Sequence, residues 1–214
     1  MNPRHHRNHA LAGYGAGVQG PRDASELEPT DDVVRVNLGA LLIPADAGVE
    51  VQVQADQVTG TVSQVNLVVP DAAVQVQPYA APRSGGLWNE IRQELVQSIE
   101  QSGGQVREVQ GSFGDELLAQ LPAAQGHQHA RFAGVEGPRW LLRLVFLGKA
   151  CEPGPTATRL EGVVRNLVIA RGDVAMPPRA PLPLSLPVEA ATAMEPEPRT
   201  LTLPQRGPEI TEIR

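Results

Sequence analysis

The sequence is poor in aromatic residues, lysine and cysteine. These shortages limit the composition of the core, the classes of partner and the cellular compartment that we expect. Only 3% of its 214 residues are aromatic, so the core must consist mainly of Val, Leu, Ile and Ala. Lys149 is the one lysine, and the formal net charge is −6. Because nucleic acids and anionic membranes are bound by concentrated basic surfaces, we expect neither as a partner.

The single cysteine, Cys151, cannot form an internal disulfide, which is typical of a protein from the reducing cytoplasm. No run of residues approaches the ~18 apolar residues that a membrane-spanning helix requires. The N-terminus has a charged start but lacks the apolar region of a secretory signal peptide. These features predict a cytoplasmic protein without a membrane segment.

Motifs for catalysis and for cofactors are also missing. The sequence has no nucleophile elbow, no phosphate-binding glycine loop, no paired-cysteine zinc pattern and no helical H-E-x-x-H. His5, His6 and His9 lie in a polar arm, and His127 and His129 lie in a glutamine-rich segment that we expect to be a loop. None of them has further ligands nearby in the sequence. We therefore expect no metal and no cofactor, and the sequence assigns no catalytic residue.

The first half of the chain reads as a sheet. Val49, Val51 and Val53 alternate with polar residues, and similar short runs extend from Val33 to Tyr79 with turn residues between them. Short, consecutive, locally connected strands favour an antiparallel sheet over a doubly wound parallel one. The apolar run 140–147 suits a central strand with both faces covered.

Two principal helices are expected to pack on this sheet. The first helix has an apolar stripe at steps of three and four residues and ends at two glycines; the stripe consists of Trp88, Ile91, Leu95 and Ile99. Thr158 and Glu161 have the spacing of a capping box, which predicts the start of the second helix. The apolar run that follows fits either a short final strand or a helix that docks deeply in the core.

The chain is therefore predicted to be an α+β protein with a mainly antiparallel sheet. Residues 1–31 are expected to be a disordered arm, residues 32–175 a single α+β domain, residues 176–187 an extended proline-leucine strap and residues 188–214 a disordered tail. The strap fits two interpretations. It is either a polyproline ligand for a partner's aromatic groove or, as we prefer, a segment whose leucines lie on the domain's own surface.

Four residues are candidates for binding a ligand or a partner: Arg83, Ser84, Trp88 and Arg143. Arg83 and Ser84 precede the first helix, where N–H groups beside an arginine suit an anion or a carboxylate of a partner. The structural alternative is that Ser84 caps the helix and that Arg83 pairs with an acidic neighbour. Arg143 interrupts the central apolar strand, so it must pair with a carboxylate or reach the rim of the sheet.

Three segments, in this order, carry a resemblance to a family: AAPRSGGLWNEIRQEL, GPRWLLRLVFLGKA and RGDVAMPPRAPLPLSLP. Over roughly residues 20 to 187 the chain resembles an uncharacterised family of actinobacterial proteins, a domain of unknown function. The resemblance implies a cytoplasmic protein and brings no established activity or ligand. The family pattern has an aromatic residue between a Gly-Pro pair and an Asp, where this chain has Arg22.

Three functions follow as hypotheses. The first is a non-enzymatic intracellular binding or chaperone-like module with a protein partner, since no catalytic constellation is present. The second is an enzyme or small-ligand binder with a site near Arg83, Ser84 and Arg143. The third, ranked last, is a binder of single-stranded nucleic acid, because the strands offer Val and Gln where stacking aromatic residues are needed.

Overall fold

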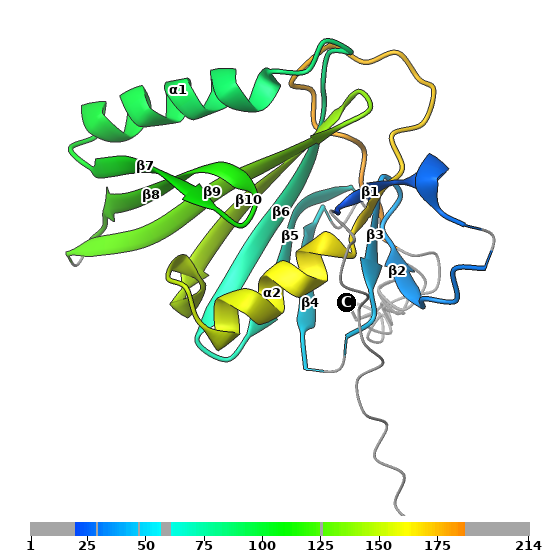
Figure 1. Cartoon of the computed structure of the whole chain (residues 1–214), viewed down its shortest axis with the longest axis horizontal. Coiled ribbons are helices and arrows are strands. Elements are labelled where there is room, and N and C mark those ends of the chain that lie inside the picture. The colour runs from blue at the N-terminus through cyan, green and yellow to red at the C-terminus, as the bar shows by residue number, and fades with distance from the viewer. Residues whose placement is uncertain (1–19, 29, 47, 57–60, 125, 187–214) are drawn as a thin grey trace, which may run out of the picture.

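A seven-stranded antiparallel sheet runs through the protein in the order β4-β5-β6-β10-β9-β8-β7 (Figure 1). The computed structural model describes residues 20–28, 30–46, 48–56, 61–124 and 126–186. The sheet consists of β4 (Glu50–Ala55), β5 (Val62–Val69), β6 (Ala72–Ala80), β7 (Gln105–Gly111), β8 (Gly114–Pro122), β9 (His127–Gly137) and β10 (Trp140–Gly148). Two helices pack on a mainly antiparallel sheet, so the predicted α+β class is confirmed.

A second, four-stranded sheet and one helix cover one face of the large sheet (Figure 1). The small sheet has the order β1-β11-β3-β2, with β1 parallel to β11 and the other pairs antiparallel. Its strands and the neighbouring helical segments are β1 (Arg22–Asp23), β2 (Arg35–Asn37), β3 (Leu41–Pro44), β11 (Val168–Ile169), η1 (Ala24–Glu26), η2 (Lys149–Cys151) and α2 (Pro155–Arg165).

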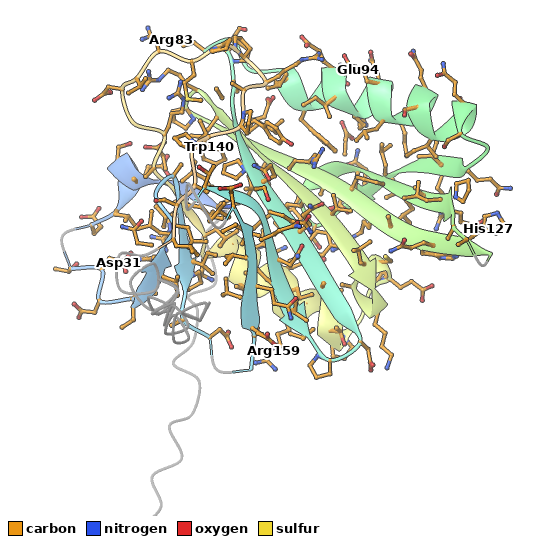
Figure 2. All side chains as sticks on the ribbon, turned by 180° about the vertical axis from the view of Figure 1, so that it is seen from behind. Asp31, Arg83, Glu94, His127, Trp140 and Arg159 are labelled. Atoms are coloured by element: carbon orange, nitrogen blue, oxygen red, sulfur yellow. The ribbon has the colours of Figure 1, made fainter. Side chains whose placement is uncertain are left out.

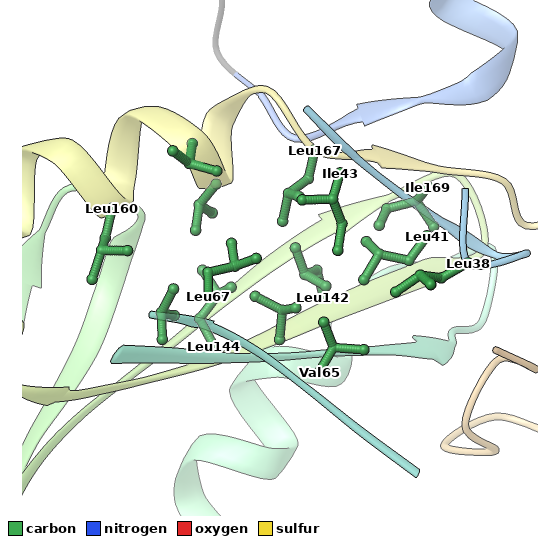
Figure 3. Packing of buried hydrophobic residues seen from close by; sticks show 14 of the residues in the cluster. Leu38, Leu41, Ile43, Val65, Leu67, Leu142, Leu144, Leu160, Leu167 and Ile169 are labelled. Atoms are coloured by element: carbon green, nitrogen blue, oxygen red, sulfur yellow. The ribbon is translucent and has the colours of Figure 1, made fainter. Parts of the chain in front are cut away.

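Helix α1 (Leu87–Gln101) packs on β7, β8, β9 and β10 from the opposite face. Strand β10 therefore contributes to two separate cores. Leu142 and Leu144 join the larger core between the two sheets, whereas Leu141 and Val145 join the smaller core beneath α1. Figure 3 shows the larger core, in which side chains of α2, the small sheet and the large sheet meet. The run 140–147 is a central strand with both of its faces covered, as its apolar sequence, interrupted only by Arg143, predicted.

The proline-leucine strap lies on the domain itself. Leu182 and Leu184 are only 2% and 3% exposed, and both belong to the larger core. Isolated bridges join the strap to the rest of the fold, pairing Tyr79 with Pro181 and Gly39 with Leu184. The preferred interpretation of this segment is therefore correct for residues up to 186.

Three local predictions differ from the structure. Residues 20–28, assigned to the disordered arm, contain β1 and η1, and Asp23 accepts a hydrogen bond from the indole Nε1 of Trp140 at 2.8 Å. The expected loop with His127 and His129 is the start of β9. Helix α2 begins at Pro155 without a side-chain cap, so the predicted capping box is wrong. Residues 1–19 and 187–214 lie outside the described residues.

Of the two continuations left open after the second helix, the structure contains the short strand. Helix α2 ends at Arg165, and Val168–Ile169 then pairs with both β1 and β3. This strand inserts between segments from the start of the domain. It thereby ties residues 20–44 to the C-terminal part of the fold.

Candidate functional site

The N-terminus of α1 is occupied by a carboxylate of the same chain. Gly85 and Gly86 have φ angles of 69° and 85°, which turn the chain sharply into the helix. Glu136, from β9, accepts hydrogen bonds from the backbone N–H of Gly86 at 2.9 Å and of Trp88 at 2.7 Å. Ser84 makes no capping hydrogen bond. The first N–H groups of the helix are therefore engaged, and the anion or partner carboxylate expected there is replaced by Glu136.

Arg83 and Ser84 are both exposed in the turn before α1. Figure 2 shows Arg83 at the periphery of the protein. Arg83 has no ion pair or side-chain hydrogen bond within the described residues, so the acidic partner expected from the sequence is not found there. No contact in this part of the chain joins Arg83 or Ser84 to Arg143. The structure does not bring these three residues together in one site.

Trp88 is an anchor of the smaller core and not a surface contact. Its side chain is only 8% exposed, and its indole Nε1 donates a hydrogen bond to the carbonyl oxygen of Asp115 at 2.8 Å. Both the ring and its polar atom are thus satisfied within the fold. A direct role in binding a partner does not fit this burial.

Arg143 is the candidate whose environment differs most from that of an ordinary structural arginine. It lies in β10 between Gln77 of β6 and Gly134 of β9 and points to the α1 side of the sheet. No carboxylate of the described residues is within 4.0 Å, and its buried Nε has no hydrogen-bond partner. Its guanidinium carbon lies 5.5 Å from the centre of the Tyr79 ring. Of the two arrangements expected from the sequence, the pairing with a carboxylate is therefore not found among the described residues, although the side chain is half-buried.

The side chain of Arg143 lines a groove between α1 and the strap. We call this groove, with a volume of about 310 Å³, the Arg143 groove. It is lined by Tyr79, Ile91, Glu94, Leu95, Ser98, Arg143 and Arg179. Arg179 of the strap forms ion pairs with Glu90 and Glu94 of α1 at 2.9 Å and 2.8 Å. The ion pairs with these two glutamates neutralise the positive charge of Arg179 at the edge of the groove. Arg143 remains as the unpaired cation within the groove.

The sheet beside the groove presents a row of uncharged amides, which we call the amide face. Residues that pair across antiparallel strands point to the same side of a sheet. Arg143 pairs with Gln77, Gln75 pairs with Asn66, and Asn66 pairs with Gln52, so all lie on one side. The amide face consists of Gln52, Gln54, Gln64, Asn66 and Gln75, which are exposed or half-buried, whereas Gln77 beside Arg143 is buried. Amides both donate and accept hydrogen bonds, so this face can bind a polar chain without selecting its charge.

A second polar cluster lies on the other side of the sheet and was not found from the sequence. Glu116 of β8, Arg131 of β9 and Glu161 of α2 are 0%, 6% and 6% exposed. Arg131 is 2.7 Å from a carboxylate oxygen of Glu161 and 3.7 Å from one of Glu116. Its guanidinium also lies 4.0 Å from the centre of the Phe146 ring. Burial raises the pKa of Glu116, and the nearby charge of Glu161 adds to this effect.

The Glu116, Arg131 and Glu161 cluster has the form of a structural ion-pair network. It joins α2 to β8 and β9, and a cavity of about 370 Å³ adjoins it. In the described part of the chain, no serine, cysteine or histidine side chain donates a hydrogen bond to either carboxylate. The geometry required for an activated nucleophile is therefore not formed there. The sequence contained one signal for this cluster, namely charged residues within otherwise apolar strands.

Within the described ranges, no group of three or more His, Cys, Asp or Glu side chains could hold a metal ion. No helix among these residues is long and apolar enough to cross a membrane.

A comparison with protein families gives one match. The family model described as "Protein of unknown function (DUF3710)" matches residues 20–193. The matched region contains both sheets, both helices and the Arg143 groove. The chain matches no curated protein.

Proposed function

The chain belongs to the family of proteins of unknown function called DUF3710, and on that premise we propose that it is a non-enzymatic binding protein for a carboxylate-bearing protein segment. The segment would bind in the Arg143 groove and along the amide face. The observation that carries this proposal is the half-buried guanidinium of Arg143, which has no carboxylate partner within the described residues. A cationic group in such a place binds an added carboxylate with little competition from the protein itself.

The chemistry of an arginine favours a carboxylate over other partners. A guanidinium presents its N–H donors in a planar fork that matches the two oxygens of a carboxylate. The Nε of Arg143 is buried and unpaired, so one donor has no compensating bond in the free protein. Because this Nε is shielded from solvent, a carboxylate in the groove would accept hydrogen bonds from the terminal N–H groups of Arg143, and the half-buried position would make the interaction stronger than one with an exposed arginine.

The amide face favours a peptide as the carrier of the carboxylate. Five accessible amide side chains lie on three adjacent strands next to the groove. Three of them take part in hydrogen bonds on this face, in which Gln52 donates to Glu50 and Gln64 donates to Asn66. The N–H and C=O groups of an extended peptide are matched by the donors and acceptors of such amides. The proposed partner is therefore an extended, acidic segment of another protein. Its binding would be determined by position in the groove and by one charged contact.

A cytoplasmic location in an actinobacterial cell belongs to the same proposal. It is supported by the free thiol of Cys151, which is buried and is the single cysteine of the chain. A partner for this surface would then be sought among cytoplasmic proteins.

Selection from a library of random decapeptides tests the proposed function. Wild type, Arg143→Gln and Arg83→Gln would be screened in parallel, and a selected acidic peptide would be titrated by fluorescence anisotropy. Arg83 is the matched control because it is an exposed arginine outside the groove. We expect wild type and Arg83→Gln to bind equally and Arg143→Gln to bind at least about tenfold more weakly.

The selected peptide would also be made with its Glu or Asp replaced by Gln or Asn. This amide peptide should bind wild type as weakly as the acidic peptide binds Arg143→Gln, and Arg143→Gln should bind both peptides with the same affinity. The proposal is overturned if no acidic peptide is selected. It is also overturned if Arg143→Gln binds like wild type.

A further inference from the structure

The described part of the fold has four sheet edges, and they differ in how well they are protected from pairing with another strand. An unpaired edge strand attracts further strands unless it is short, charged or covered. In the small sheet, β1 has two residues and β2 has three, and Arg35 in β2 is charged. In the large sheet, the edge strand β7 carries Arg107 and Glu108 next to each other. These three edges are short or charged.

Strand β4, at the other end of the large sheet, is longer than β1 and β2, and its one charged residue, Glu50, is at its start (Figure 1). It is six residues long and pairs only with β5. Its residues from Val51 to Ala55 carry no charge and no proline. Gln52, Val53 and Gln54 are exposed, and Val53 is a valine with 37% of its surface in solvent although it faces the side of the larger core.

The sequence of β4 is complementary to itself when two copies run antiparallel. With Gln52 of each copy on a two-fold axis, Val51 of one copy lies opposite Val53 of the other, and Glu50 lies opposite Gln54. All valines then lie on one face and all amides on the other. A register centred on Val53 instead would place Glu50 opposite Asp56 twice, and facing carboxylates destabilise a pair of strands. A register centred on Val51 brings no like charges together, but it pairs only Glu50–Gln52 of β4 with each other. The register centred on Gln52 pairs Glu50–Gln54 and also avoids like charges, so it satisfies both conditions.

We propose that two copies of this chain pair through β4 in this register, so that the large sheet continues across a two-fold axis. The pairing gives the outward backbone N–H and C=O groups of β4 their partners and covers Val53. It also joins the amide faces of the two copies into one surface, because Gln52 and Gln54 lie on the same side of the sheet in each copy. The dimer rests on β4 alone and does not require the Arg143 groove to bind a ligand.

Charge exchange at the two-fold axis tests this dimer. We expect sedimentation velocity to show a dimer for wild type, and at least about tenfold weaker dimerisation for Gln52→Lys and for Gln52→Glu, because each places like charges opposite each other. An equimolar mixture of the two variants should dimerise again, now as a heterodimer. Gln105→Lys, on the β7 edge, is the matched control and should dimerise like wild type. Circular dichroism would verify that each variant is folded.

A cross-link identifies the register directly. Gln52→Cys in a Cys151→Ser background should form a disulfide between two copies under mild oxidation, whereas Gln105→Cys in the same background should not. A monomeric wild type at high concentration overturns the proposal. A dimer that survives Gln52→Lys, or one that the mixture of charge variants does not restore, overturns it as well.

Discussion

The indole ring of Trp88 lies directly on the Cα atom of Gly134, since a β-carbon built at residue 134 would be 2.3 Å from Cδ2 of the ring. The contact joins α1 to β9 and fixes the height of the helix above the sheet. Gly134 also pairs with Arg143 on β10. The missing side chain at Gly134 therefore leaves room both for the Trp88 anchor and for the arginine beside it.

Substitution of Gly134 by alanine should destabilise the fold through this contact. We expect Gly134→Ala to lower the free energy of unfolding by about 1–3 kcal/mol, because the new methyl group overlaps the ring of Trp88. Trp88→Ala should cost about 3–5 kcal/mol by itself. In the Trp88→Ala background, Gly134→Ala should cost much less. Urea unfolding of the four proteins measures this coupling, and equal costs in both backgrounds would refute the contact.

The carboxylate of Glu136 caps the N-terminus of α1, so removal of this carboxylate should destabilise the protein. We expect Glu136→Ala to destabilise the protein by about 1 kcal/mol, as does the loss of other N-terminal caps. Ser84→Ala is the control, and it should have almost no effect because Ser84 makes no capping bond. Thermal unfolding of both variants distinguishes the two caps. If Ser84→Ala lost more stability than Glu136→Ala, Ser84 would be the cap of α1, as the sequence suggested.

The stability of the protein should depend on pH through Glu116. Burial raises the pKa of this carboxyl group in the folded state, so the folded protein holds the proton more tightly than the unfolded chain. The free energy of unfolding should therefore fall as pH rises from about 4.3, the ordinary value for glutamate, through the folded-state pKa.

Glu116→Gln cannot titrate and is the reference for this effect. Urea unfolding of both proteins from about pH 4 to about pH 8 should show that wild type loses stability relative to Glu116→Gln as pH rises. A difference between the two proteins that stays constant with pH would contradict the assignment. A relative gain of wild type at high pH would contradict it more strongly.

Cys151 should react slowly in the folded protein. Its thiol is buried and lies within hydrogen-bonding distance of the carbonyl oxygens of His129 at 3.4 Å and Phe146 at 3.2 Å. Burial raises the pKa of the thiol, so little thiolate is present at neutral pH. We expect Ellman's reagent to modify Cys151 much more slowly in buffer than in 6 M urea, a concentration of about twice a common unfolding midpoint. Equal rates in the two conditions would show an accessible thiol.

The elements of the fold that the sequence predicted are those with a regular pattern. The alternation around Val51 and the helical stripe that begins at Trp88 each have one period and one buried face, and the run 140–147 is apolar on both faces except at Arg143. They all correspond to elements of the structure. The strap was also identified correctly, because its prolines exclude a helix and its leucines recur on one side.

The features that the sequence missed depend on contacts between distant residues. The cap on α1 comes from Glu136, 48 residues after Trp88, and no local pattern indicates it. Residues 20–28 have a polar composition that suggested disorder. In the structure, Asp23 accepts a hydrogen bond from the indole of Trp140, which lies 117 residues later in the sequence. Glu161 has the spacing of a capping box and instead faces Arg131 in a buried ion pair. Local spacing cannot distinguish such alternatives.

For the candidate site, the sequence left two arrangements of Arg143 open. A charged residue in a central apolar strand was predicted either to pair with a carboxylate or to reach the rim of the sheet. The structure places it in a groove beside Tyr79, with no carboxylate of the described residues within 4.0 Å; Glu94, which also lines the groove, pairs with Arg179. Arg83, Ser84 and Trp88 were grouped with Arg143 because they are close in the sequence around α1. Their positions in the fold separate them from Arg143.

The most direct test is an NMR titration that follows the Nε–H signal of the Arg143 guanidinium. The signal is assigned by its loss in Arg143→Gln, and wild type is then titrated with a selected acidic peptide and with the same peptide in which the carboxylate is an amide. The proposed function predicts that the acidic peptide shifts the Arg143 signal and that the amide peptide does not, while the signal of Arg83 stays in place. A bound acidic peptide that leaves the Arg143 signal unchanged would contradict the central claim.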